Sequence, residues 1–535
     1  MDLIWKDLKI PVEQDETELP HFLAAKLKVA VQTIRNWRIL RRSVDARKKP
    51  QIFFVYTIEF TLDLPPKKVN GILARFPQIK EKPPVKEYFL VPKPDKKLVT
   101  RPIVVGTGPA GYFAALTLAE NGYRPLVLER GDEVGLRSQA VAKFWQTGEL
   151  DPESNVQFGE GGAGTFSDGK LTTRINDQRV RKVLEKFVEL GADPEILYVA
   201  KPYIGTDVLK KIVVGLRKKL ESLGGEVIFR AKVTSLKIEN GRLQGVEINQ
   251  KEIIPAETVI LAVGHSARDV YLFLQKLGVI LEQKPFAIGL RVEHEQEFIN
   301  MLQYGVLNHP RLGAADYQLT YNDKLSGRGA YTFCMCPGGQ VVAASSEAGG
   351  VVTNGMSNSR RDSGIANSAV VVTVSSADFP SANPLAGVEF QREWERKAFL
   401  AGGKNYYVPA QAVPDFLAGK VTREFDLLPT YRPGFTSVNL HTILPSKIGE
   451  VLVRALQAFD EKLPGFVSRK AVLTGIESRT SSPVRILRDD SGQSLNLKGL
   501  FPAGEGAGYA GGITSSAVDG LKAAEKLMQQ YAPPD

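Results

Sequence analysis

The 535-residue sequence predicts an α/β protein in which a parallel-sheet domain is interrupted by an α+β domain and preceded by a small, basic α+β domain. Three observations predict this class. Two short apolar strands flank a helix pattern between residues 102 and 130, as in a βαβ unit. Further buried-strand patterns end at Gly264 and Gly504, and much of the chain between them has a different texture of mixed strands and loops. Residues 1–100 carry most of the net charge.

The expected domain boundaries follow these changes in texture. Residues 1–98 form the basic domain and a linker, because six prolines between residues 77 and 102 predict an extended chain. Residues 99–279 form the first part of the parallel-sheet domain, and residues 280–470 form the inserted domain. Residues 471–535 return the chain to the parallel sheet.

The basic domain combines helical and strand patterns. Apolar residues recur at helical spacing between residues 18 and 40, which predicts one or two short helices, and residues 52–64 alternate as a strand. Between them lies a cluster of cations: Arg38, Arg41, Arg42, Arg47, Lys48 and Lys49. Residues 1–100 hold 20 Lys or Arg and 12 Asp or Glu, a balance of +8 within the total of +10. This surface is a candidate contact for an acidic protein partner or for RNA, with Trp37 beside the cations, or it packs on the rest of the chain.

A GxGxxG motif joins the first strand to its helix. Gly106 permits the tight turn, Gly108 lets the backbone approach a pyrophosphate, and Gly111 lets helix and strand pack closely. The helix begins at Pro109, so its N-terminus attracts phosphate groups. Glu129 ends the second strand 23 positions after Gly106, where a carboxylate accepts hydrogen bonds from ribose hydroxyls. The motif therefore predicts a Rossmann-type dinucleotide-binding unit.

Two further glycine-rich segments favour a larger, extended cofactor. Residues 159–170 match GxGxxG by letters, but no buried strand precedes them, so a loop that passes close to a cofactor is expected. Residues 504–512 lie between a buried strand and a helix that starts near Ile513. That arrangement directs backbone N–H groups and a helix dipole at the negative charge of a reduced flavin. The alternative for both segments is a glycine-rich surface loop.

Long motifs in this order resemble the largely uncharacterised bacterial FAD-dependent (NAD(FAD)-utilizing) dehydrogenases, relatives of the glutathione-reductase-type flavoproteins. The resemblance covers nearly the whole chain, and the segments that carry it are GTGPAG at 106–111, GGAGTFSDGKLTTR at 161–174, AVGHSARD at 262–269, CMCPGG at 334–339, NGMSNSRRDSGIANSAVVV at 354–372 and GEGAGYAGGITSSAVDG at 504–520. It implies a bound FAD, an FAD domain interrupted by a substrate domain, and a site that faces the isoalloxazine ring. The family supplies no substrate.

The fold class is therefore α/β: a split Rossmann-type FAD-binding domain with an inserted α+β substrate domain and a small basic N-terminal α+β domain. The candidate FAD-binding residues are Gly106, Gly108, Pro109, Ala110, Gly111, Glu129, Arg130, Gly161, Gly162, Ala163, Gly164, Thr165, Lys170, Gly264, Gly504, Glu505, Gly511, Gly512 and Ile513.

Two cysteines are candidate catalytic residues. Cys334 and Cys336 lie two apart on an expected strand, hence on one face. A thiol pair beside a flavin could relay electrons or form a reactive thiolate, but disulfide-reducing flavoenzymes carry a wider pair on a helix. The alternative is that both are small strand residues. With no further cysteine, no metal site is predicted.

Other polar residues have a functional and a structural interpretation each. His265 follows a buried strand and is a candidate acid or base, or a hydrogen-bonding residue near the crevice. Lys170 and Arg174 could hold a pyrophosphate or an anionic substrate, or form a solvated pair. Four residues of the inserted domain could bind a carboxylate or could be ordinary surface residues: Arg291, His294, Arg360 and Arg361.

Composition limits the location. No window approaches eighteen uncharged apolar residues, the N-terminus resembles neither a signal nor a transit peptide, and two cysteines suit a reducing compartment. We expect a cytoplasmic protein without a membrane span.

The predicted function is an FAD-dependent oxidoreductase that transfers hydride or electrons through flavin N5 to or from a small-molecule substrate. No second strand–GxGxxG–helix unit is evident, so NAD(P)H is expected, if it acts at all, as a transient donor. An FAD-dependent RNA-modifying enzyme and a non-catalytic flavin-binding sensor or adaptor are the alternatives.

Overall fold

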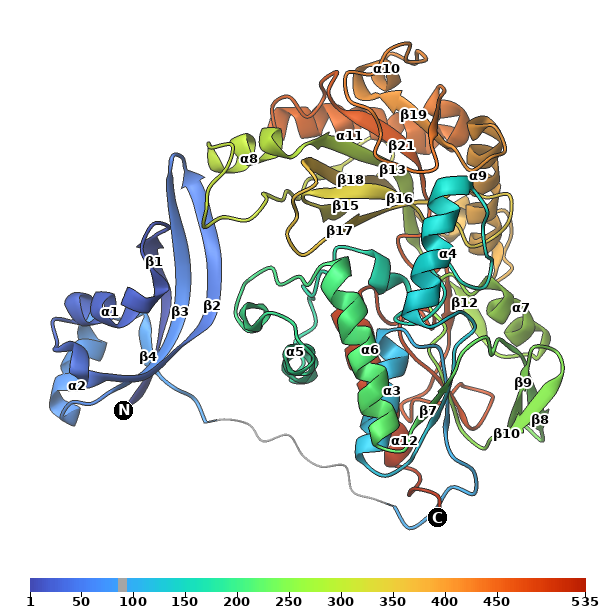
Figure 1. The fold of residues 1–535 in the computed structure, drawn as a ribbon, viewed down its shortest axis with the longest axis horizontal. Helices are drawn as coiled ribbons and strands as arrows, with labels where there is room; N and C mark the ends of the chain where they lie inside the picture. The colour runs from blue at the N-terminus through green and yellow to red at the C-terminus, as the bar shows by residue number, and fades with distance from the viewer. Residues whose placement is uncertain (85–93) are drawn as a thin grey trace.

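The computed structural model describes residues 1–84 and 94–535 and has three domains (Figure 1). The inserted domain lies above the parallel-sheet domain in Figure 1, and the N-terminal domain lies to their left. The predicted linker falls partly on residues 85–93, which lie outside the described residues. In the described part of the chain, no helix has the length and apolarity needed to cross a membrane.

The N-terminal domain is a four-stranded antiparallel sheet, in the order β2-β3-β1-β4, with two helices on one face. Its elements are β1 (Asp2–Pro11), α1 (Leu19–Leu27), β2 (Ile34–Lys48), β3 (Gln51–Leu62), α2 (Pro66–Arg75) and β4 (Ile79–Glu81). Alternate residues of β3 from Ile52 to Leu62 are buried against the helices, as its period-2 pattern predicts. The chain order βαββαβ is a split βαβ arrangement.

The helical prediction for residues 18–40 is correct only for its first part. Helix α1 ends where Lys28 adopts a left-handed conformation, and from Ile34 the chain is strand β2. The cations predicted to lie between two elements are instead on β2 or just after it. Register shifts at Arg35–Arg38 and Ile39–Arg41 interrupt the alternation of β2. The sequence of β2 therefore lacks the period-2 pattern that predicts a strand.

The second domain has a five-stranded parallel sheet in the order β23-β11-β5-β6-β7. Its strands are β5 (Ile103–Val105), β6 (Leu126–Leu128), β7 (Glu226–Ile228), β11 (Val259–Leu261) and β23 (Leu500–Pro502). Helices pack on one face, and an antiparallel sheet with one helix packs on the other. These elements are α3 (Pro109–Glu120), α5 (Arg179–Glu189), α6 (Thr206–Ser222) and α12 (Ile513–Met528) on the first face, and β8 (Val233–Glu239), β9 (Arg242–Ile248), β10 (Glu252–Pro255) and α7 (Arg268–Lys276) on the second. Both faces are buried, which explains the continuous apolar strands.

The inserted domain is built on a seven-stranded sheet in the order β14-β15-β18-β13-β21-β19-β20. Its strands are β13 (Phe286–Glu295), β14 (Thr320–Asn322), β15 (Gly329–Cys336), β18 (Ile365–Val374), β19 (Val408–Ala412), β20 (Phe435–Ser437) and β21 (Val472–Glu477). The other elements of this region are α4 (Val134–Thr147), α8 (Gln296–Tyr304), β16 (Gly339–Ala343), β17 (Thr353–Ser357), α9 (Ala386–Gly402), α10 (Val413–Leu417) and α11 (Ser446–Lys462). The sheet includes β21, so this domain extends past the expected boundary at residue 470.

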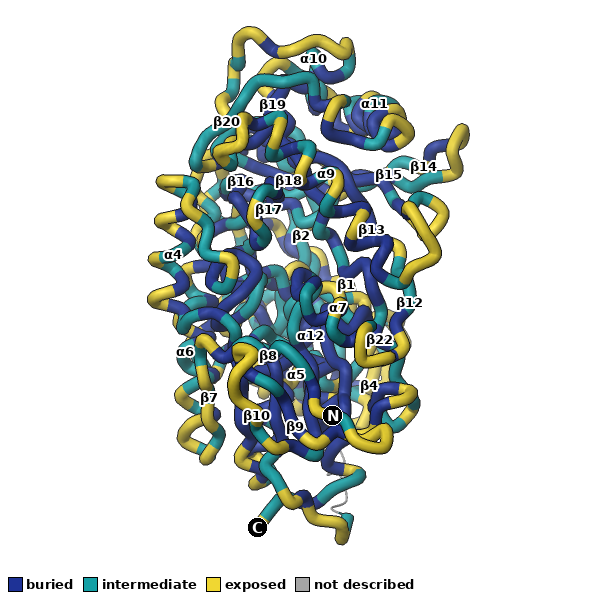
Figure 2. The backbone as a smooth tube through the Cα atoms, turned by 90° about the vertical axis from the view of Figure 1, so that its right-hand side faces the viewer, coloured by how far each residue is buried: buried dark blue, intermediate teal, exposed yellow. Residues whose placement is uncertain are grey.

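Two connections join the inserted domain to the parallel-sheet domain. Strands β12 (Leu281–Gln283) and β22 (Val484–Ile486) pair where the chain leaves and returns. Figure 2 shows the buried backbone of the central strands between exposed outer loops, in agreement with the nearly unbroken burial of β13 and β18. The sheet side chains of this domain pack against α11 from one face.

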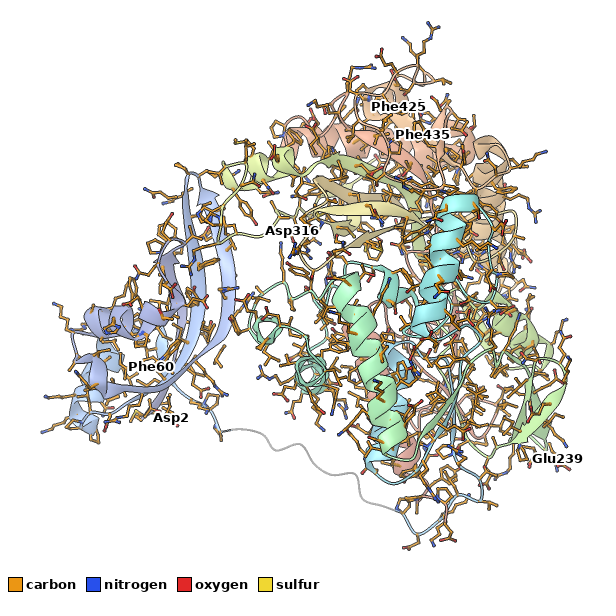
Figure 3. All side chains as sticks on the ribbon, viewed as in Figure 1. Asp2, Phe60, Glu239, Asp316, Phe425 and Phe435 are labelled. Carbon is orange, nitrogen blue, oxygen red and sulfur yellow. The ribbon has the colours of Figure 1, made fainter. Side chains whose placement is uncertain are left out.

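The N-terminal domain contacts both other domains: Arg42 pairs with Glu195 of the parallel-sheet domain, and Lys49 Nζ donates to the Leu302 oxygen of the inserted domain. Asp316, on the side of the inserted domain that faces the N-terminal sheet, accepts from Lys201 Nζ at 2.7 Å, whereas Glu239 marks the far side of the molecule (Figure 3). Phe60 fills the separate N-terminal core. The basic cluster thus lies partly at an interface within the chain.

Candidate functional site

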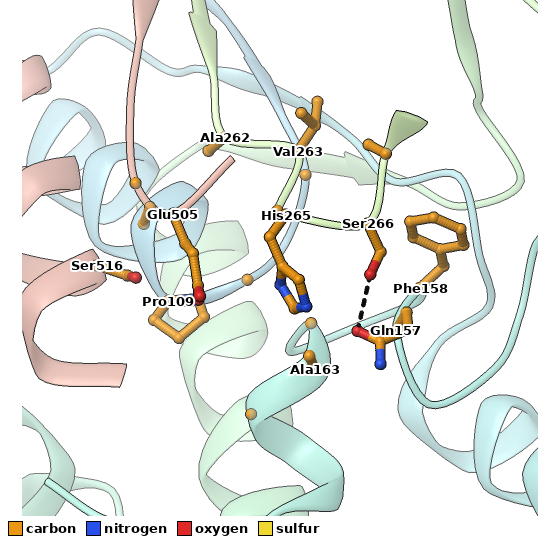
Figure 4. Close-up of a pocket in the computed structure, with 18 of the residues that line it drawn as sticks. Pro109, Gln157, Phe158, Ala163, Ala262, Val263, His265, Ser266, Glu505 and Ser516 are labelled. Atoms are coloured by element: carbon orange, nitrogen blue, oxygen red, sulfur yellow. Dashed lines mark hydrogen bonds between the residues drawn. The ribbon is translucent and has the colours of Figure 1, made fainter. Parts of the chain in front are cut away.

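One cavity is lined by all three glycine-rich segments and by the inserted sheet (Figure 4). Its walls come from the turn after β5, the loop at residues 157–170, the turn after β11 and the segment before α12. These turns follow the carboxyl ends of the parallel strands, the usual place for a ligand in an open α/β sheet.

The three glycines of the GxGxxG motif each lack a side chain for a different structural reason. Gly106 has φ +99°, and a Cβ there would lie 2.4 Å from the Ala262 carbonyl oxygen. A Cβ on Gly111 would lie 1.9 Å from the Gly106 oxygen, so this glycine serves packing rather than lining the cavity. A Cβ on Gly108 would meet nothing closer than Gly162 Cα at 3.9 Å. Gly108 therefore keeps open space in front of α3.

Two helix N-termini point their free backbone N–H groups at the cavity. Helix α3 follows Gly108 and helix α12 follows Gly512, and neither residue provides a side-chain cap. Both glycines line the cavity, as do Pro109, Ala110 and Ile513 at the first turns. Uncapped N-termini carry partial positive charge and unsatisfied donors, so they favour an anionic ligand.

Glu129 holds the glycine loops together. Its carboxylate accepts from the backbone N–H groups of Thr107, Gly131 and Gly159 at 2.9–3.0 Å, and from the Thr107 hydroxyl. These four donors occupy about four lone-pair positions. Its predicted contact with a ribose stays a prediction. The neighbouring Arg130 also lines the cavity, stacks 4.0 Å from the Phe158 ring centroid, and pairs with Asp269.

His265 and Glu505 enter the cavity from neighbouring loops, which follow the paired strands β11 and β23 (Figure 4). The Nε2 atom of His265 has no hydrogen-bond partner, and burial together with the charge of Arg479 lowers its pKa to about 3. Burial raises the pKa of Glu505 to about 7, against the weaker opposing effect of Lys284. At neutral pH the imidazole is therefore uncharged, and the carboxyl group is near its midpoint.

The inserted domain contributes a wall of which the sequence predicted only Cys334. Its members include Phe333, Cys334, Asn354, Glu477 and Arg479. Glu477 accepts two hydrogen bonds from the guanidinium of buried Arg291, at 2.8 and 3.0 Å. The missed residues Glu477 and Arg479 follow the apolar run 471–476, and polar residues at such a strand end were the available signal.

The cysteines do not lie on one face of a regular strand as predicted. Phe333 pairs with Ala369 and Cys336 with Asn367, so β15 has one more residue than its partner β18. Cys334 occupies this bulge with φ +45° and lines the cavity, whereas Cys336 is fully buried behind it.

The structure brings most of the predicted residues to one cavity and removes a few. The predicted residues on its lining are Gly106, Gly108, Pro109, Ala110, Glu129, Arg130, Gly162, Ala163, Gly164, Lys170, Gly264, His265, Cys334, Gly504, Glu505, Gly511, Gly512 and Ile513. Gly161 and Thr165 instead line a small apolar space beneath the loop, next to α6. Arg174 and Arg360 are exposed.

The candidate clamp residues have partners inside the protein. Arg361 pairs with buried Asp168 and stacks on Tyr203. His294 is buried, and its Nε2 lies 2.9 Å from the Phe466 oxygen. Arg291 is held by Glu477. None of these three lines the cavity.

Comparison with known proteins assigns the family. Residues 100–273 match the family model for pyridine nucleotide-disulphide oxidoreductases, residues 285–480 match the model for the C-terminal domain of FAD-dependent proteins, and residues 4–61 match a domain of unknown function. An uncharacterised protein of Clostridium beijerinckii is 46% identical over 537 residues, which is 99% of each chain. The chain belongs to an uncharacterised family of FAD-dependent proteins.

More distant relatives match parts of this FAD-dependent chain. FixC of Escherichia coli K12 is 30% identical over 196 residues, 36% of this chain and 42% of FixC. The probable electron transfer flavoprotein-quinone oxidoreductase YdiS of the same strain is 25% identical over 192 residues, 35% of this chain and 42% of YdiS. Among solved structures, a geranylgeranyl bacteriochlorophyll reductase-like protein of Thermoplasma acidophilum has 15% identity and a TM-score of 0.35, covering 80% of this chain and 77% of its own.

The residues around the cavity fit FAD, the cofactor of this family. The space before Gly108 and the uncapped α3 N-terminus suit a pyrophosphate, and the α12 N-terminus suits a second region of negative charge. A Cβ on Gly511 would meet no atom within 4 Å, so the backbone there is open to the cavity.

Proposed function

We propose that this FAD-dependent oxidoreductase transfers two electrons, as hydride, between flavin N5 and a small-molecule substrate beside the inserted sheet. One observation carries the proposal: a single cavity joins the three glycine segments to the wall of Phe333, Cys334 and Glu477. A substrate against this wall would meet the flavin within the same cavity.

The proposed roles divide along the cavity. Gly108 and the first turn of α3 would hold the pyrophosphate, and Gly511 to Ile513 would face the flavin end. When bound, FAD supplies the hydride acceptor or donor, and the protein supplies position and electrostatics. The α12 dipole would favour negative charge beside it.

Two side chains are suited to hydrogen bonding and proton transfer. His265 stays neutral at physiological pH, so its imidazole is able to accept a hydrogen bond at one nitrogen and to donate one from the other. Glu505 changes charge near pH 7, which suits a group that holds or releases a proton at its carboxyl oxygen. Both lie on the cavity lining.

The electron donor separates two versions of the proposal. NAD(P)H would dock transiently, because the described residues contain one strand–GxGxxG–helix unit and no second. The partial similarity to YdiS favours the other version, in which electrons pass to or from a quinone or another flavoprotein.

Anaerobic titration of the purified protein tests the proposal. We expect a flavin spectrum that NADH, NADPH or a reduced quinone bleaches rapidly. Bound flavin that every donor leaves oxidised would instead favour the sensor or adaptor.

The RNA-modifying alternative rests on the N-terminal domain, whose basic sheet has one face free of its own helices. Several cations already have acidic partners, such as Arg38 with Glu59 and Arg42 with Glu195, so fewer are free for phosphates. Salt-sensitive tRNA binding that disappears on removal of residues 1–98 would support this alternative. An acidic protein partner remains a proposal of the same kind.

A further inference from the structure

We propose that Cys334 and Cys336 form a redox-active dithiol that exchanges two electrons with the flavin, so that each chain stores two electron pairs. The inference rests on the proposed function, because the flavin is the oxidant of the thiols. The pair lies on the inserted sheet rather than on a helix of the FAD domain.

Cys334 has an unusual backbone conformation. The bulge in β15 places this residue at φ +45°, a left-handed conformation that glycine normally fills. Cys334 thus occupies a strained position that a residue without a side chain would fill more easily. In exchange, its side chain lies on the cavity lining that also includes His265, Glu505 and Gly512.

Cys336 contacts Cys334 directly. Cys336 is fully buried, and its Sγ lies 3.2 Å from the Cys334 carbonyl oxygen. Arg291 Nη1 donates to the Cys334 oxygen at 3.3 Å and to Asn367 at 2.8 Å, which fixes the backbone of the bulge. Both thiols are free, so the pair is a dithiol with one member at the cavity.

A positive charge lies beside the two cysteines. Lys170, on the glycine loop of the FAD domain, places its Nζ 3.9 Å from Cys336 Sγ and 2.7 Å from Asp168. The neighbouring Cys336 and the charges of Lys170 and Arg291 lower the pKa of Cys334, whereas the pKa of Cys336 is raised, so that the shared proton stays with Cys336. A thiolate is the reactive form in disulfide exchange and in attack on an electrophile.

The proposed oxidation of the two cysteines by FAD conserves electrons, protons and charge. The Cys334 thiolate and the Cys336 thiol lose two electrons as the S–S bond forms. The two electrons and the Cys336 proton would pass to oxidised FAD, so that the total charge of the reacting groups is −1 before and after the reaction. The reverse step reduces the disulfide. No other oxidant or reductant takes part.

The test counts electrons and thiols per bound FAD in the holoprotein. Oxidised wild-type protein is titrated with dithionite under argon, beside Cys334→Gly and Cys336→Ser. Cys334→Gly is the safer variant, because glycine adopts the conformation of the bulge without strain. Thiols that remain after the flavin has been reduced and reoxidised with ferricyanide are alkylated in denaturant and counted by mass. Apoprotein treated in the same way is the control for direct thiol oxidation.

We expect wild-type protein to take up about four electrons per FAD and both variants about two. The wild-type thiols should disappear after flavin turnover and persist in apoprotein. Bound, reducible FAD with about two electrons in wild type and two persistent thiols would overturn the dithiol and leave the proposed function intact. Equal thiol loss in apoprotein would also overturn it. A protein that binds no FAD would overturn both proposals.

Discussion

Individual titratable residues in the cavity depend on burial for their protonation state. His265 has an unpartnered ring nitrogen and a lowered pKa, and Glu505 has a raised one. The two groups differ in sign: desolvation keeps the histidine neutral and also keeps the carboxylic acid protonated to higher pH. His265 is thereby uncharged at neutral pH, whereas Glu505 changes charge near pH 7.

Glu505 should make apoprotein stability depend on pH. Its folded pKa is about 7, whereas the unfolded value is about 4.3, so its favourable contribution is present below pH 4 and is lost as the pH rises through 7. We therefore expect Glu505→Gln to raise the Tm of apoprotein, with an advantage that grows between pH 5 and pH 8. Exposed Glu239, changed to Gln, is the control and should show no such trend. An equal Tm difference at both pH values would contradict the assignment.

The structural role of Gly111 was predictable because its reason is local: a Cβ there would lie 1.9 Å from the Gly106 oxygen. Gly106 has the positive φ that a tight turn requires, although its closest contact is with the distant Ala262. Glu477 and Arg479 reach the same cavity from more than 300 positions away, through the register of β21 in a sheet. Short-range patterns contain no information on that register, and the bulge at Cys334 likewise depends on the pairing with β18.

Elements of the two larger domains are joined by a buried ionic network. Arg268 at the start of α7 and Arg479 after β21 both bind Glu395 on α9, with distances from 2.6 to 3.1 Å. Arg268 is 1% exposed and Glu395 2%. A single carboxylate thus compensates two buried guanidinium groups, with Glu347 assisting Arg268.

Glu395→Gln should be strongly destabilising. It leaves two buried cations without this partner, and breaking such a pair costs about 3–5 kcal/mol. Glu393→Gln on the same helix removes only an exposed pair with Lys397 and should cost less than about 0.5 kcal/mol. Urea unfolding of both variants measures the difference. Equal free energies of unfolding would show that the network does not stabilise the domain contact.

Strand β2 shows the limit of periodicity at the element scale. Leu23 and Leu27 lie in a helix, but Val31 lies in a short 3-10 helix and Ile34 begins a strand. Three register shifts break the alternation of β2, and the strand lies at an edge that another domain covers in part. The parallel βαβ unit was predictable because its strands are buried on both faces and its turn has a fixed spacing.

At the scale of the whole molecule, Arg42 joins the N-terminal domain to the parallel-sheet domain. Its backbone N–H donates to the Tyr198 oxygen, and its backbone oxygen accepts from the Ala200 N–H, both at 2.8 Å. A short segment of the parallel-sheet domain therefore lies parallel to β2 and pairs with it. The guanidinium binds Glu16 and Glu195, each at 2.6 Å. One side chain therefore links both sides of the domain contact.

Arg42→Ala should loosen this contact without unfolding either part. Loss of the charged hydrogen bonds costs about 2 kcal/mol, which is roughly a 30-fold change in the opening equilibrium. Hydrogen exchange at Ala200 should accelerate accordingly, whereas exchange in the core of β3 stays slow. Arg41→Ala, at an exposed neighbour, is the control. Unchanged exchange at Ala200 would contradict the role of Arg42.

The most direct test of the central claim is the affinity for FAD of Gly108→Ala and Gly313→Ala. Both positions have room for a methyl group and neither has a positive φ, so both variants should fold like wild type. Gly108 faces the cavity before α3, whereas Gly313 is exposed and lies outside it. If the cavity holds FAD, flavin titration of the apoproteins will show at least about a tenfold loss of affinity for Gly108→Ala and none for Gly313→Ala. Equal affinity in the two variants would contradict the placement of FAD in this cavity.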